Sequence, residues 1–142
     1  MHIEINDNTS LREIQEVFSR FYPYLKIVFY SKHHKKYEPS DEMDEIDPNV
    51  LVDDIKTTHV SGVLEILPLY KVSEVEKEFQ QRFGLSVQIF RKEKNDWKQT
   101  KGTDDFTLKE LNEIGRNSSD EFIVQDYEEG FQQNEEKPDK LY

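Results

Sequence analysis

Two adjacent histidines followed by a run of acids have the clearest capacity for metal chemistry in this sequence. His33 and His34 precede Asp41, Glu42, Asp44 and Glu45. Imidazole and carboxylate groups together can bind a divalent cation. Neighbouring side chains of an extended chain point in opposite directions, however, and the two adjacent histidines lack the i, i+4 spacing of a helical ligand pair. The run also lacks the central glycine of a calcium-binding loop. We therefore predict a solvated loop and no metal site.

A nucleophilic site has no better support. Ser61 follows His59 closely, but no nucleophile-elbow or oxyanion-loop pattern surrounds the two residues. The five glycines are isolated, so the sequence has no phosphate-binding loop. We predict no catalytic residue and no cofactor. The alternative from the enzyme class is a metal-dependent hydrolase that uses His59, or His33 and His34, with nearby carboxylates.

One region combines several cations with the single tryptophan of the chain. It contains Arg91, Lys92, Lys94, Trp97, Lys98 and Lys101. Such a surface can bind an anionic partner, because ammonium groups pair with carboxylates and the indole ring adds contact area. The competing interpretation is a solvated hairpin whose lysines keep a sheet edge from pairing with another chain.

A second candidate surface lies near the C-terminus. From Glu121 to Tyr127 the sequence has alternating character and high β propensity. This segment is predicted either to add an edge strand to its own sheet or to dock on the exposed edge of a neighbour. A homo-oligomer through an edge strand or the tail stays open for the same reason. The predicted partner-binding residues are Arg91, Lys92, Trp97, Lys98, Lys101, Phe122, Val124 and Tyr127.

The charge of the chain narrows the class of partner. Thirty acidic residues against nineteen basic ones give a formal net charge of −11. Nucleic acids and anionic membranes both require concentrated positive charge, so we expect neither, and a protein is the predicted partner. The same charge keeps open an acidic decoy or immunity-type protein that blocks a basic partner. The absence of cysteine excludes disulfides and thiolate metal sites.

No targeting or spanning segment is apparent. The start MHIEIND lacks the basic and apolar regions of a signal peptide, and no apolar run approaches the ~20 residues that cross a membrane. The sequence therefore predicts a soluble, cytoplasmic protein.

The elements that must position these residues form an internal repeat. Residues 3–30 align with residues 64–91 at a shift of 61, which becomes 60 beyond Tyr24. Ile5 falls on Ile66 and Phe18 on Phe79, so the matched positions are those of a core. Each copy reads as strand, amphipathic helix and strand.

Serine or threonine followed three residues later by glutamate predicts the start of a helix. This pattern occurs at Ser10 with Glu13, at Ser73 with Glu76 and at Thr107 with Glu110. Gly84 is predicted to end the second helix in a left-handed conformation, and Gly115 is predicted to cap the third helix.

We predict one α+β domain over residues 1–131, in which two tandem strand–helix–strand units carry an added hairpin strand and a third helix. A ferredoxin-like arrangement or a related α/β sandwich would account for the repeat. The alternative is an α+β topology in which the second unit alone forms the core. Residues 32–58 are predicted to form a mobile charged excursion, and residues 132–142 a disordered acidic tail.

The run GLSVQIFRK, followed by Trp97 and TDDFTLKELNEIG, resembles segments of a small uncharacterised bacterial protein family with no known activity. The resemblance covers about Val72 to Gly115. It implies a bacterial, cytoplasmic protein and carries no site residues with it. From the residues themselves, the predicted function is a non-enzymatic protein-interaction or regulatory module.

Overall fold

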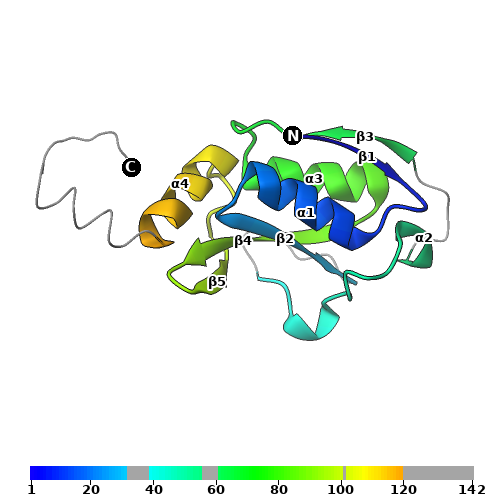
Figure 1. Ribbon diagram of the computed structural model, residues 1–142, viewed down its shortest axis with the longest axis horizontal. Helices are drawn as coiled ribbons and strands as arrows, with labels where there is room; N and C mark the ends of the chain where they lie inside the picture. The colour runs from blue at the N-terminus through cyan, green and yellow to red at the C-terminus, as the bar shows by residue number, and fades with distance from the viewer. Residues whose placement is uncertain (32–38, 56–60, 101, 120–142) are drawn as a thin grey trace, which may run out of the picture.

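The computed structural model describes residues 1–31, 39–55, 61–100 and 102–119 (Figure 1). Its fold is α+β, as predicted, with helices and two antiparallel sheets. The elements are β1 (His2–Asn6), α1 (Leu11–Phe21), β2 (Leu25–Tyr30), η1 (Glu42–Asp44), α2 (Val52–Ile55), β3 (Ser61–Glu65), α3 (Val72–Phe83), β4 (Ser86–Glu93), β5 (Asp96–Gln99) and α4 (Leu108–Ser119).

The strands of the two units are divided between two sheets. β1 pairs with β3 in a two-stranded ribbon, and β2, β4 and β5 form a three-stranded sheet in that order. A ferredoxin-like fold would place all four repeat strands in a single sheet, so that detail is not confirmed. The added hairpin strand is β5, and the added helix is α4. In Figure 1 the ribbon lies above the helices and the three-stranded sheet below them.

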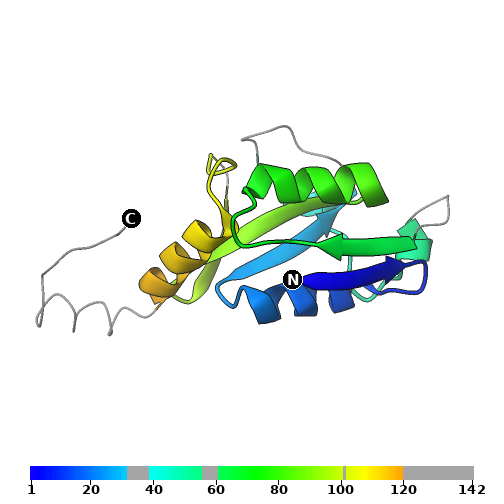
Figure 2. The same ribbon diagram turned by 90° about the horizontal axis from the view of Figure 1, so that it is seen from above.

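Each strand of the first unit pairs with its counterpart in the second. Ile3 faces Leu64 in the ribbon, and these are equivalent residues at the shift of 61. Val28 faces Gln88 in the larger sheet, and these are equivalent at the shift of 60. Antiparallel pairing through equivalent residues relates the two units by an approximate two-fold axis. Figure 2 shows the result, with α1 and α3 on opposite sides of the β1–β3 ribbon.

The core lies between the ribbon, the two helices and the larger sheet. Phe18 of α1 and Phe79 of α3 are fully buried there. The Phe79 ring meets the Phe29 ring of β2 edge-on, with 6.0 Å between their centroids. Burying such rings removes roughly 150–250 Å² of surface each from water, which makes them major contributors to stability.

The helix starts test the capping predictions. The capping box of Ser10 and Glu13 is present at α1. The prediction from Ser73 and Glu76 is wrong: α3 begins at Val72, and the Glu74 carboxylate accepts from the backbone N–H of Lys71 at 2.7 Å. Glu76 is instead buried within the helix. The repeat alignment gives the correct register, because it places Ser10 on Lys71.

The helix ends differ from each other. Gly84 ends α3 with a φ of 64°, as predicted. Gly115 does not end α4, which continues to Ser119. A Cβ atom at Gly115 would lie 2.9 Å from both Cβ and the backbone oxygen of Tyr24. The glycine therefore permits close packing of α4 on the sheet, and the third Thr–Glu pattern correctly marks its start at Thr107.

Residues 39–55 belong to the predicted excursion, yet they are hydrogen-bonded to the body of the protein. The backbone N–H of Ser31 donates to Asp44, and that of Ile46 donates to Phe29 at 2.8 Å. Val52 is fully buried in the core. Residues 32–38 and 56–58, which complete the excursion, and the predicted tail at 132–142 lie outside the described residues. Within the described ranges, no helix has the length and apolar character needed to cross a membrane.

Candidate functional site

The site forms on the face of the three-stranded sheet that points away from the helices. Successive side chains of a strand alternate between the two faces, so Ile27 and Ile89 point into the core while Lys26 and Phe90 point outward. The register places Lys26 opposite Phe90 and Lys92 opposite Trp97. Three adjacent strands therefore bring two lysines and two aromatic rings to one outer surface. We call Lys26, Phe90, Lys92 and Trp97 the lysine–aromatic cluster.

Both lysine ammonium groups lie against the indole ring. The Nζ atom of Lys26 is 5.2 Å from the centroid of the Trp97 ring and 5.3 Å from that of Phe90. The Nζ atom of Lys92 is 5.1 Å from the Trp97 ring centroid. Cation–π contacts of this length contribute roughly 0.5–1 kcal/mol at partly exposed sites. They fix the positions of the ammonium groups but leave their hydrogen-bond donors available.

The ammonium groups of the cluster have no protein acceptor in the part of the chain that the structure describes. Neither the Lys26 side chain nor the Lys92 side chain forms an ion pair or a hydrogen bond there. Arg91 and Lys98, on the opposite face of the same strands, lie 3.8 Å and 4.0 Å from the carboxylate of Glu93. These unpaired ammonium groups belong to a chain whose formal net charge is −11.

The predicted partner-binding residues of the hairpin are thus divided between the two faces of the sheet. Lys92 and Trp97 are brought together, whereas Arg91 and Lys98 point to the other face, because strand residues alternate. The predicted residues Lys101, Phe122, Val124 and Tyr127 lie outside the described residues.

Sequence reasoning missed Lys26 and Phe90. Their signal was available: Phe90 is an aromatic residue on the solvent side of an alternating strand, and Lys26 interrupts an apolar run. The sequence could not supply the register between β2 and β4, which places Lys26 beside Phe90.

Residues 40–46 cross the same face of the sheet and border the cluster on one side. The backbone N–H of Ser40 donates to the Gln99 side-chain oxygen at 2.9 Å, and the Gln99 amide donates back to the Ser40 carbonyl at 3.0 Å. The Ser40 hydroxyl donates to the buried side chain of Gln88 at 3.3 Å. From Ser40 the chain continues through η1 to the outer edge of β2, where Ile46 bonds to Phe29. In Figure 1 this segment lies below the sheet, opposite the helices.

The two ends of the outer face are related by the internal two-fold axis but differ in chemistry. Tyr30 is equivalent to Phe90, and Ser86 is equivalent to Lys26, at the shift of 60. Tyr30 is buried, and burial together with the nearby carboxylates of Glu45 and Glu42 raises the pKa of its phenol to about 12. One end of the face is therefore covered by an acidic segment, while the other presents half-buried cations and rings.

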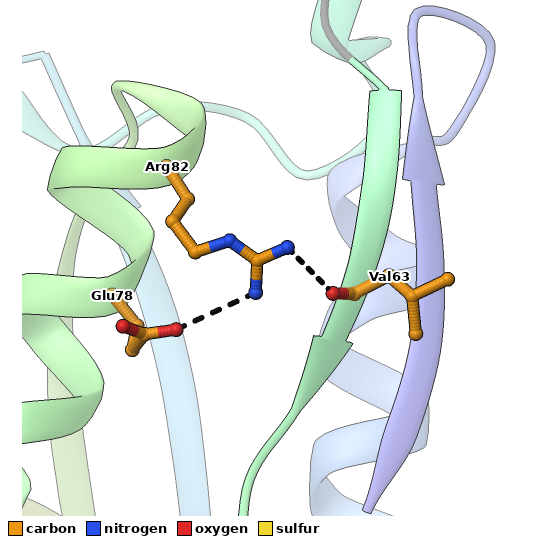
Figure 3. Close-up of polar contacts among 3 residues, drawn as sticks. All are labelled: Val63, Glu78 and Arg82. Atoms are coloured by element: carbon orange, nitrogen blue, oxygen red, sulfur yellow. Dashed lines mark hydrogen bonds and ion pairs between the residues drawn. The ribbon is translucent and has the colours of Figure 1, made fainter.

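The β2 edge of the larger sheet and the β3 edge of the ribbon are less suited to binding a partner strand. The outward carbonyls of Leu25, Ile27 and Phe29 in β2 accept from Ser19, Gln15 and Ile46 respectively. On β3, the Arg82 guanidinium donates to the Val63 carbonyl at 2.8 Å and lies 3.5 Å from Glu78 (Figure 3). Side chains that occupy edge carbonyls hinder pairing with a further strand.

Metal chemistry receives no support from the residues in the described ranges. Among them, no group of three or more histidine, aspartate and glutamate side chains is placed to hold a metal ion. The Asp41 carboxylate accepts from the backbone N–H of Met43 and so caps η1. His33, His34 and His59 lie outside these ranges, so their predicted roles stay untested.

Comparisons with family models, with curated protein sequences and with solved structures found no match to this chain. The functional assignment therefore rests on the geometry of the lysine–aromatic cluster.

Proposed function

We propose that the protein is a non-enzymatic interaction module and that its lysine–aromatic cluster binds an acidic segment of a partner protein. The observation that carries the proposal is the pair of ammonium groups held against one indole ring without a carboxylate partner among the described residues. A partner carboxylate would supply the missing acceptors. A partner apolar side chain would cover the exposed part of the rings.

The physical chemistry favours a segment with both kinds of group. A hydrogen bond between charged groups contributes about 1.5–3 kcal/mol, and a buried tryptophan at an interface commonly contributes about 2 kcal/mol or more. The lysines are already ordered by their contacts with Trp97, which reduces the side-chain entropy lost on binding. The net charge of −11 repels acidic partners in general. Local complementarity at the cluster must therefore provide the specificity.

The test uses Trp97, the only tryptophan in the chain, as an intrinsic fluorescent reporter. A synthetic peptide of glutamates with one central phenylalanine is titrated into the full-length protein at physiological ionic strength. Lys92→Glu is compared with the matched control Lys98→Glu, which makes the same charge change on the opposite face. Because both variants alter the net charge equally, a difference between them reports the local site.

We expect saturable binding by the unmodified protein. Lys92→Glu should weaken it by about 10-fold to 100-fold, from the loss of one charged hydrogen bond. Lys98→Glu should change it by about two-fold or less, because an exposed ion pair contributes little. Equal weakening by both variants, or no binding by the unmodified protein, would contradict the proposal. Thermal unfolding of each variant confirms that the fold is retained.

A further inference from the structure

The two ends of the outer sheet face are equivalent by the internal two-fold axis, yet the described residues cover only one of them. The Tyr30 end is crossed by residues 40–46, an acidic segment attached through Ser40 and Ile46. The Phe90 end carries the lysine–aromatic cluster. An acidic segment of the chain itself thus already packs on one half of this face.

We propose that the chain's own acidic segment of residues 120–131 occupies the lysine–aromatic cluster in the free protein and competes with the partner segment for it. This inference rests on the binding surface of the proposed function and names its resident occupant. Binding of an external partner then requires displacement of this segment. The protein would therefore carry a built-in inhibitor of its own interaction surface.

The composition of the segment complements the cluster. Residues 120–131 read DEFIVQDYEEGF, with five acidic residues, no basic residue and three aromatic ones. Carboxylates supply acceptors for Lys26 and Lys92, and the aromatic side chains supply contact area for the rings of Trp97 and Phe90. No described residue competes for the two ammonium groups.

The path of the chain makes the contact short. Gly115 of α4 packs against the backbone oxygen of Tyr24, and this oxygen also accepts from the backbone N–H of Lys92 at 2.9 Å. Helix α4 therefore passes directly beside a residue of the cluster. Ser119 follows Gly115 by four residues, which is about 6 Å along a helix. Eight further residues can span at most roughly 27 Å.

Covalent linkage strengthens a weak contact. A segment joined by a short flexible linker experiences an effective concentration on the order of 1 mM. A segment that would bind only with a dissociation constant of about 0.1 mM as a separate peptide would thus occupy the cluster most of the time. The apparent dissociation constant of the partner for the full chain then equals the intrinsic constant divided by the fraction of molecules whose cluster is uncovered.

The test exploits one tryptophan and the absence of cysteine. A nitroxide spin label is attached to the full-length Gln125→Cys variant, and the quenching of Trp97 fluorescence is measured against the reduced label. Gln81→Cys is the matched control, because Gln81 is an exposed residue of α3 on the other side of the sheet. Each measurement is repeated after ten-fold dilution, in high salt, and with Lys26→Glu and Lys92→Glu added.

We expect about two-fold or stronger quenching from position 125, unchanged by dilution and relieved by salt or by the two lysine substitutions, as electrostatic contact requires. Position 81 should give little quenching. Quenching from position 125 no greater than from position 81 would overturn the inference. Quenching that disappears on dilution would also overturn it, because the occupant would then be a second copy of the chain.

The glutamate-peptide titration separates the two proposals. Peptide binding that depends on Lys92 but not on Lys98, together with absent quenching, would refute only the inference about residues 120–131. Equal dependence on both lysines would refute the surface itself.

Discussion

Replacement of Gly115 by alanine tests how tightly α4 packs on the sheet beside the cluster. By helix propensity alone this change should stabilise the protein, because alanine is favoured over glycine in a helix interior by about 1 kcal/mol. The structure predicts the opposite. The added Cβ atom would meet Cβ and the backbone oxygen of Tyr24 at 2.9 Å and Cγ of Arg91 at 3.4 Å.

The expected loss follows from which atoms must move. Separations of 2.9 Å are well inside ordinary carbon contact distances of about 3.5–4.0 Å. The Arg91 side chain can move away, but the Tyr24 oxygen cannot do so freely, because it also accepts from the backbone N–H of Lys92. Overpacking of this kind costs typically 1–3 kcal/mol. After the propensity gain is subtracted from the middle of that range, a net loss of about 1 kcal/mol remains.

The assay is thermal and chemical unfolding of Gly115→Ala against Asn117→Ala. Asn117 lies on the exposed side of the same helix, so its replacement should leave stability unchanged or raise it by a few tenths of a kcal/mol. Gly115→Ala should lower the melting temperature by roughly 5 °C. A Gly115→Ala variant as stable as the unmodified protein would refute the close packing of α4.

Two further predictions concern the buried tyrosines. The Tyr30 hydroxyl is buried and has no hydrogen-bond partner among the described residues, whereas that of Tyr22 donates to the Ile66 carbonyl at 3.3 Å. In chemical unfolding, Tyr30→Phe should therefore be neutral or stabilising by up to about 1–2 kcal/mol, while Tyr22→Phe should cost about 1 kcal/mol; the reverse order would contradict the two environments. Burial raises the pKa of both phenols to about 12 from an ordinary 10.0, so the unfolded chain loses these protons first as pH rises. Stability should be unaffected below pH 10 and fall between about pH 10 and 12, by on the order of 2–3 kcal/mol per tyrosine. Denaturant unfolding between pH 9 and 11.5, with phenolate absorbance, checks this, and a flat profile through pH 11.5 would contradict it.

Local signals in the sequence were sufficient for much of the fold. The repeat at a shift of 61 identified the strand–helix–strand units, and Gly84 marked a helix end because its backbone conformation favours glycine. The predictions of helix ends and starts failed where tertiary or competing contacts determine the local conformation. The sequence pattern predicts a helix end at Gly115, whereas the structure shows that the close approach of Tyr24 requires a glycine there. The capping pattern at Ser73 was outweighed by Glu74, whose carboxylate accepts from Lys71.

The candidate site was also predictable from the sequence only where local patterns determine it. Composition around Trp97 drew attention to the hairpin, and alternation within a strand could have separated Lys92 from Lys98. The contribution of Lys26 depends on the pairing of β2 with β4, two strands whose register follows from the internal two-fold axis. The charges and prolines around Ser40 predict a mobile segment. Its hydrogen bonds to Gln88 and Gln99 are long-range contacts that no local pattern indicates.

The most direct test of the lysine–aromatic cluster is to locate a bound carboxylate on the protein. An isotopically labelled glutamate peptide is added to the full-length protein and joined to adjacent ammonium groups with a carbodiimide, and the linked lysines are identified by mass spectrometry. We predict that the peptide is joined mainly to Lys26 and Lys92, and that a prior excess of unlabelled peptide removes the products. Equal linkage to Lys98 and to the exposed Lys77 of α3 would contradict the assignment, because it would mean that carboxylates meet lysines by exposure alone.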